Sequence, residues 1–166
     1  MAGAGKSFIG RNLAKELNFE FVDTDDLMEK AQNMKLQKIL DQYGDQKFIA
    51  IENEIIINLK NIQNKIISPG GSIIYSRQAM QFLKDNSIVI YLADDYQKII
   101  SRIKNLYSRG IVGLKNKNFS QLYKEREKLY IKYADITIDM SKMQTDNKEV
   151  KAKQVTAKII DQLKNY

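Results

Sequence analysis

The sequence of 166 residues contains no cysteine, no histidine and no tryptophan, and only one proline. The absence of cysteine excludes disulfide bonds and cysteine-based zinc sites, and the absence of histidine excludes most catalytic triads. Any general base must therefore be a carboxylate or a lysine. No apolar run approaches the roughly 18–20 residues that cross a bilayer, and the N-terminus lacks a basic segment followed by an apolar one. We therefore expect a cytoplasmic protein with no membrane partner.

The composition is that of an ordinary globular chain, with 43% apolar and 28% charged residues. The length predicts a single domain over residues 1–166 with one substantial core. The formal net charge is +7, but the lysines are dispersed among glutamates and aspartates. This pattern favours a solvated lysine-rich surface over a nucleic-acid site, and anionic small substrates fit it equally well. We expect a monomer.

Short apolar runs alternate with longer helical patterns along the chain. Helical spacing links Phe48, Ile51 and Ile55, and it recurs at Val155 and Ile159. The predicted strands cover residues 19–22, 65–68, 88–92 and 136–138. Strands separated by helices predict an α/β fold whose parallel sheet is covered on both faces.

The first seven residues end in Gly5-Lys6-Ser7, the close of a phosphate-binding loop whose first glycine would fall before Met1. In such a loop, backbone N–H groups and the N-terminus of the next helix surround a polyphosphate, while the lysine adds a mobile cation. The alternative is a flexible, glycine-rich end of the chain.

A phosphate loop of this kind follows a central strand, and no strand precedes this one. Its loss would forfeit about 6–12 kcal/mol of burial. We hypothesise that Met1 is an internal methionine of a longer natural chain or a misassigned start. Mass spectrometry that finds Met1 or Ala2 at the end of the native protein would contradict this hypothesis.

Two further patterns follow predicted strands. Asp23-Thr24-Asp25-Asp26 could bind a hydrated Mg²⁺ and accept a proton, or Thr24 or Asp25 could cap a helix that starts near Leu27. Ser68-Pro69-Gly70-Gly71-Ser72 could admit a substrate to bare backbone, or could simply form a turn.

Three arginines occur late in a lysine-rich chain: Arg102, Arg109 and Arg126. A guanidinium is planar and always charged, which suits carboxylate and phosphate binding. Each could equally be part of a surface salt bridge.

Together these patterns resemble shikimate kinase, a small P-loop kinase of the nucleoside-monophosphate-kinase type, from Met1 to about Asp139. No single pattern is specific, but the ordered set is. The matching residues are Gly3 to Ser7, Gly10-Arg11, Leu13-Ala14, Phe21 to Asp25, Phe48 with Glu52, Gly70-Gly71, Arg109, Arg126, Leu129-Tyr130 and Ala134-Asp135. The resemblance implies a three-layer αβα P-loop kinase whose parallel sheet lacks its first, central strand, with a lid over approximately residues 104–120.

The implied activity is the ATP-dependent phosphorylation of a shikimate hydroxyl to shikimate 3-phosphate, a step of aromatic amino-acid biosynthesis. On the ATP side, Ser7 and Asp23 would hold Mg²⁺, and Lys6 would act in catalysis. The residues implied to bind ATP are Gly3, Ala4, Gly5, Lys6, Ser7, Arg102 against adenine, and Arg109 from the lid.

On the acceptor side, the resemblance implies that Asp25 contacts the reacting hydroxyl and acts as its base. Gly70 and Gly71 would line the shikimate pocket. Arg126 would bind the shikimate carboxylate.

Three positions depart from the family pattern. Ile49 replaces an arginine expected on the shikimate carboxylate, Ser72 replaces a third glycine, and Gly110 replaces the proline of the lid. The lost arginine contact is worth about 1.5–3 kcal/mol. A kinase of another acceptor, such as gluconate or a nucleotide, therefore stays open, as does a nucleotide-binding relative without catalysis. No aromatic residues alternate with basic ones as a nucleic-acid binder would require.

Overall fold

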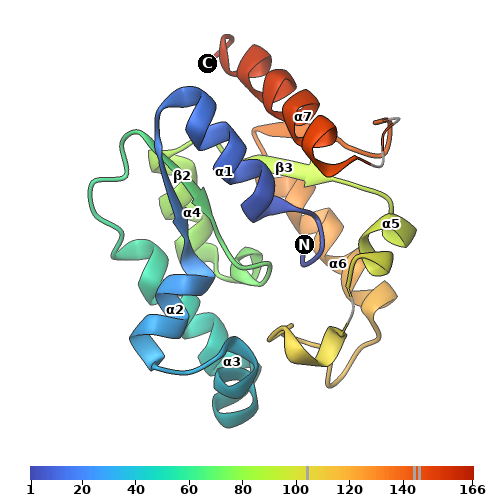
Figure 1. Ribbon diagram of the computed structural model, residues 1–166. Coiled ribbons are helices and arrows are strands. Elements are labelled where there is room, and N and C mark those ends of the chain that lie inside the picture. The colour runs from blue at the N-terminus through green and yellow to red at the C-terminus, as the bar shows by residue number, and fades with distance from the viewer. Residues whose placement is uncertain (104, 144, 146) are drawn as a thin grey trace.

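The computed structural model describes residues 1–103, 105–143, 145 and 147–166, with helices packed around short strands (Figure 1). Its elements, in chain order, are α1 (Lys6–Leu17), β1 (Glu20–Asp23), α2 (Thr24–Gln32), α3 (Leu36–Ile57), β2 (Lys65–Ser68), η1 (Ile73–Tyr75), α4 (Arg77–Asn86), β3 (Ile90–Ala93), α5 (Tyr96–Ser101), η2 (Leu106–Ser108), α6 (Phe119–Tyr133), β4 (Ile136–Asp139) and α7 (Lys148–Leu163). All four predicted strands are present, with ends that differ by up to two residues.

The strands form two parallel pairs. β1 pairs with β2, Glu20 opposite Lys65, and β3 pairs with β4, Ile90 opposite Ile136. Among the described residues no ladder joins β2 to β3. A cavity of 220 Å³ lies between the two pairs and is lined by apolar side chains of β2, β3, α1 and α4. The prediction of a parallel sheet without its central strand is therefore confirmed.

Helices cover both faces of these strands. On one face α1 and α7 pack together, and their Leu13 and Val155 share a buried cluster with Ile138 of β4. On the other face Ile56 of α3 and Met80 of α4 form a second cluster, against which Tyr133 of α6 packs. This arrangement is the predicted three-layer αβα fold.

The start of α2 differs from the expected one. Asp23 occupies the N-cap, and its Oδ1 accepts a hydrogen bond of 3.2 Å from the backbone N–H of Asp25. The prediction that Thr24 or Asp25 caps this helix is therefore wrong. Because both residues lie inside the first helical turn, the side chain of Asp25 does not serve as the cap.

The segment predicted as a lid, 104–120, is described except for residue 104. It packs against α3, since the backbone N–H of Gly110 donates to Gln37 Oε1 at 2.9 Å and that of Gly113 to Asp45 Oδ2 at 3.1 Å. Ile111 and Val112 are buried. The segment is thus held over one side of the molecule by both backbone bonds and apolar contacts.

Within the described ranges, the helices are too short or too polar to serve as candidate membrane spans.

Candidate active site

The N-terminal loop lines a cleft of 830 Å³. Helix α1 begins at Lys6, directly after Gly5, whose φ of 83° is in the left-handed region that glycine tolerates best. Glycine at this N-cap offers no side-chain acceptor to the first N–H groups of the helix. Those groups and the positive end of the helix dipole suit a phosphate group. In Figure 1 this loop lies between the α2–α3 side and the α5–α7 side of the molecule.

Lys6 and Ser7 lie at the start of α1. The Lys6 ammonium donates to the Met1 carbonyl oxygen at 3.4 Å. Burial lowers the pKa of Lys6, and the carboxylates of Asp25 and Asp23 partly oppose this shift. Ser7 Oγ donates to Asp23 Oδ2 at 2.7 Å. The loop, the end of β1 and the start of α2 are thereby joined at one point.

Asp25 faces the same cleft from the first turn of α2. Burial raises its pKa, with smaller contributions in the same direction from Asp23 and Asp26, while Lys6 opposes the shift. A carboxylate with a raised pKa is a better proton acceptor than an ordinary one. The position and the electrostatics of Asp25 both suit a general base.

The glycine pair after β2 lies close to other residues of the cleft. A Cβ atom on Gly70 would lie 2.1 Å from Glu52 Oε1 and 2.8 Å from Asp25 Oδ1, so both carboxylates would have to move to admit a side chain there. The Gly70 N–H donates to Thr24 Oγ1 at 3.3 Å, which fixes this loop to α2. The backbone of Gly70, which the sequence predicted to be open to a substrate, therefore faces the carboxylates of Glu52 and Asp25.

Glu52 and Ser72 form a buried pair beside Gly70. Ser72 Oγ donates to Glu52 Oε2, and both residues are at most 5% exposed. Burial raises the pKa of Glu52 to about 7, although the hydrogen bond from Ser72 opposes the shift. The sequence patterns predict no role for either residue, and Ser72 stands where the family pattern has a glycine.

Arg126 is the most deeply buried charged side chain of the cleft, at 2% exposure. It donates to the Val112 carbonyl oxygen at 2.7 Å and to Tyr75 Oη at 3.4 Å. A Cβ on Gly71 would lie 3.2 Å from Arg126 Nη1. The partners of this guanidinium are neutral oxygens, so its charge is available to an anion in the cleft.

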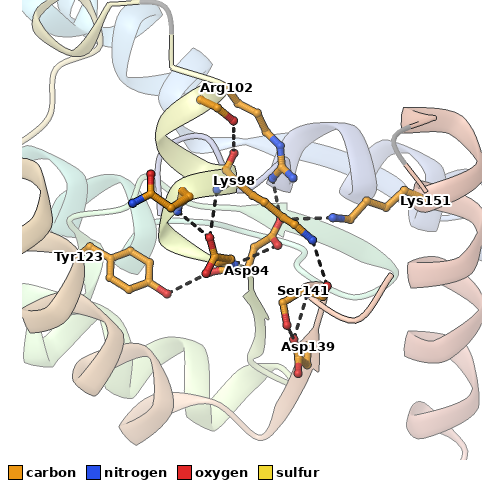
Figure 2. Close-up of polar contacts among 10 residues, drawn as sticks. Asp94, Lys98, Arg102, Tyr123, Asp139, Ser141 and Lys151 are labelled. Carbon is orange, nitrogen blue, oxygen red and sulfur yellow. Dashed lines mark hydrogen bonds and ion pairs between the residues drawn. The ribbon is translucent and has the colours of Figure 1, made fainter. Parts of the chain in front are cut away.

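At the opposite side of the loop, Arg102 is held by a buried carboxylate (Figure 2). Arg102 Nη1 lies 2.7 Å from Asp94 Oδ2, and Lys151 Nζ of α7 lies 3.3 Å from the same oxygen. Burial alone would raise the pKa of Asp94, but the hydrogen bond and charge of Arg102 and the charge of Lys151 lower it overall. Arg102 and Lys151 line the cleft together with Met140 and Met143.

The structure brings the predicted site residues together. Asp23 accepts a hydrogen bond from Ser7, which lines the cleft. Arg109 of the lid segment is exposed, and it lines the cleft together with Gly110. The predicted residues that line the cleft are Gly3, Ala4, Gly5, Lys6, Ser7, Asp25, Gly70, Gly71, Arg102, Arg109 and Arg126. Their individual roles stay predictions.

Sequence reasoning missed Asp94 and Lys151. Asp94 follows β3 directly, just as Asp23 ends β1. The rule that singled out Asp23, a carboxylate at the carboxyl end of a predicted strand, would have found Asp94 as well. Lys151 carries no such signal, because it is one lysine of a lysine-rich helix.

The oxygen atoms around Ser7 fit Mg²⁺. The hydroxyl of Ser7 and the carboxylate of Asp23 are hard ligands within hydrogen-bond distance of each other. The described residues contain no cluster of three or more carboxylates, histidines or cysteines that could hold a metal alone. Mg²⁺ at nucleotide sites commonly takes one or two protein oxygens, with phosphates and water completing the shell.

Comparisons with known proteins identify the family. The family profile described as "Shikimate kinase" matches residues 2–164. A shikimate kinase of Bacillus mycoides is 35% identical over 149 residues, which is 90% of this chain and 87% of that protein. One of Caldanaerobacter subterraneus subsp. tengcongensis is 30% identical over 141 residues, 84% of this chain and 82% of that protein.

Solved structures give the same result. The structure of shikimate kinase from Acinetobacter baumannii in complex with shikimate matches with a TM-score of 0.85 at 26% identity, covering 99% of this chain and 89% of that one. Shikimate kinase from Aquifex aeolicus matches with a TM-score of 0.79 at 25% identity, covering 98% and 91%. The chain therefore belongs to the shikimate kinase family, and its activity is that of an ATP-dependent kinase acting on a small alcohol acceptor.

Proposed function

We propose that this chain phosphorylates shikimate with Mg²⁺-ATP, with Asp25 as the base, Lys6 at the phosphates and Arg126 on the acceptor carboxylate. The observation that carries the proposal is the pairing of Asp25 with Arg126 in one cleft. One group can accept a proton, and the other is a buried cation whose partners are neutral oxygens. An acceptor with both a hydroxyl and a carboxylate satisfies both groups.

The nucleotide is bound by the N-terminal loop. Its phosphates meet the N–H groups at the start of α1 and the Lys6 ammonium, whose pKa burial lowers while the carboxylates of Asp25 and Asp23 partly oppose the shift. Arg109 approaches from the lid segment and adds positive charge at the same cleft. These groups hold the γ-phosphoryl in place and neutralise the charge that spreads over its oxygens.

The transfer itself forms one bond and breaks one. The acceptor oxygen bonds to the γ-phosphorus of ATP, and the bond between that phosphorus and the β,γ-bridging oxygen breaks, which releases ADP. The proton of the acceptor hydroxyl passes to Asp25, whose raised pKa makes it receptive. Because Gly70 has no side chain, the carboxylates of Asp25 and Glu52 can lie directly against its backbone, and this keeps Asp25 at the acceptor side of the cleft.

Ser7 and Asp23 are the residues that would hold Mg²⁺. When bound, the ion supplies positive charge to the phosphate oxygens. The hydrogen bond between Ser7 and Asp23 pre-orients both oxygens for this role.

A kinase of a different acceptor is the second candidate, and Ile49 is the observation that favours it. Ile49 lies one helical turn before Glu52 on α3 and packs against the apolar cluster of Met28 and Ile39. The acceptor carboxylate therefore has Arg126 but no second arginine from this position. A smaller or less acidic acceptor would lose less by this change.

The test is ADP formation with Mg²⁺-ATP across shikimate, quinate, gluconate and nucleoside monophosphates. We expect stimulation by shikimate above all others, with shikimate 3-phosphate as the product identified by mass spectrometry. Stimulation only by another acceptor would support the second candidate. Nucleotide binding without stimulation by any acceptor would mean that the chain has lost catalysis.

A further inference from the structure

The cluster of Asp94, Arg102 and Lys151 is not used by the chemistry above. The Asp94 side chain has no exposed surface, although it belongs to a loop between β3 and α5. Its Oδ1 also accepts from the N–H of Asp95 at 3.0 Å, and its carbonyl oxygen accepts from Tyr123 Oη at 3.0 Å. A carboxylate this buried is retained at a cost in desolvation, which its two cations and its hydrogen bonds offset.

The place of the cluster in the cleft indicates which part of a nucleotide lies beside it. The phosphates occupy the N-terminal loop, and the acceptor side holds Asp25 and Arg126. The remaining wall of the cleft presents the guanidinium of Arg102 together with Met140 and Met143. A planar cation beside apolar thioethers suits the face of an aromatic base.

We propose that Asp94 is a positioning residue for the nucleotide, which fixes the Arg102 guanidinium at the base end of the cleft and ties it to α7 through Lys151. This inference rests on the proposed function, because it assigns the base end of an ATP site. Arg102 is 35% exposed and ends the short helix α5, so its own element restrains it little. The bond to Asp94 Oδ2 supplies that restraint.

The shared oxygen has a second consequence. Because Arg102 and Lys151 both pair with Oδ2, the carboxylate links the loop after β3 to the first turns of α7. On the same side of the cleft, the Lys98 ammonium of α5 donates a hydrogen bond to the Ser141 carbonyl oxygen at 3.1 Å. Figure 2 shows this contact beside the Asp94 cluster. The base end is thus closed by ionic contacts between segments that are distant in sequence.

The test compares Lys151→Met with the double variant Asp94→Asn/Lys151→Met. The double variant removes one negative and one positive charge, so the net charge of the cluster stays the same and folding is favoured. Relative to Lys151→Met alone, we expect the KM for Mg²⁺-ATP to rise about 3- to 30-fold as Arg102 loses its anchor. The kcat and the KM for shikimate should change by less than about twofold.

A second comparison separates positioning from a general structural effect. In an Arg102→Ala background, Asp94→Asn should raise the KM for ATP no further, because there is no guanidinium left to hold. ADP binding measured by calorimetry should follow the same pattern without turnover. Asp85→Asn is the control, an exposed carboxylate of α4 that does not line the cleft, and it should leave the KM for ATP unchanged.

An unchanged KM for ATP in the double variant, or an equal rise with and without Arg102, would overturn the inference. A wild-type protein that fails to bind nucleotide at all would instead overturn the proposed function. The two failures are therefore distinguishable in one set of measurements.

Discussion

The two ends of the cleft differ in how their buried charged groups are paired. At the acceptor end, burial raises the pKa of Asp25 and of Glu52, and Arg126 is bonded to neutral oxygens. At the base end, the carboxylate of Asp94 is paired with two cations, and its pKa is lowered. Groups at the first end remain free to exchange protons or to bind an anion, whereas groups at the second end are fixed by one another. Reactive positions and positioning contacts are thus separated in space.

The largest effect is expected where a proton is transferred. Asp25→Asn removes the base, and we expect turnover to fall by at least about 100-fold while the affinity for ATP changes little. Asp26→Asn, one residue further along and exposed, is the control and should retain turnover. Steady-state kinetics measures both. If Asp25→Asn kept normal turnover, the acceptor end would not be the reactive one.

Arg126→Ala tests whether the Arg126 guanidinium, which is bonded only to neutral oxygens among the described contacts, binds the acceptor carboxylate. We expect the KM for the acceptor to rise about 10- to 150-fold through loss of a charge-assisted contact, with a smaller change for ATP. Arg77→Ala on the exposed face of α4 is the control. Thermal denaturation of both variants checks the fold. Equal losses for acceptor and nucleotide would assign Arg126 to the support of the lid through Val112 instead.

Glu52→Gln tests the raised pKa by its effect on stability. The unfolded carboxyl releases its proton near pH 4.5, whereas the folded one keeps it up to about pH 7. Wild-type stability should therefore fall as the pH rises through this window, by about 1–3 kcal/mol relative to Glu52→Gln. Urea unfolding of both proteins at pH 4 and pH 8 measures this difference. A constant difference would show that Glu52 ionises normally in the fold.

Ile49→Arg sharpens the comparison by adding a cation to the acceptor end. An arginine at this position projects from the same face of α3 as Glu52, and we expect the KM for shikimate to fall about tenfold. Ile49→Met, which keeps the apolar packing without a charge, is the control. A tighter KM for the arginine variant alone would mark Ile49 as a determinant of acceptor affinity; no change would remove it from that role.

Much of the architecture follows from local patterns. The alternation of apolar runs with helical patterns predicted each strand that the described residues form. In β2, for example, Ile66 and Ile67 are half-buried, and they pack against two different apolar clusters. Strand ends were less well predicted. The run from Ile88 enters its ladder only at Ile90, since Ile88 is 37% exposed and precedes the pairing with β4.

The site residues that lie close together in the sequence could be predicted. The pairs that meet only in the folded protein could not. Gly5, Lys6 and Ser7 are contiguous, and Asp23 and Asp25 follow a strand, so their pattern is visible in the chain. Ser72 meets Glu52 and Lys151 meets Asp94 only after helices pack, at separations of 20 and 57 residues. No local spacing encodes such pairs.

The division of the strands into two pairs affects how the protein unfolds locally. β1, α2, α3 and β2 form one continuous crossover unit that carries Asp25 and Glu52, and β3 through β4 forms another that carries Asp94 and Arg102. Contiguous segments of this kind commonly open as cooperative units with their own free energies. Hydrogen exchange would then reveal two opening energies, and an acceptor bound by both Asp25 of the first unit and Arg126 of the second would protect amides in both.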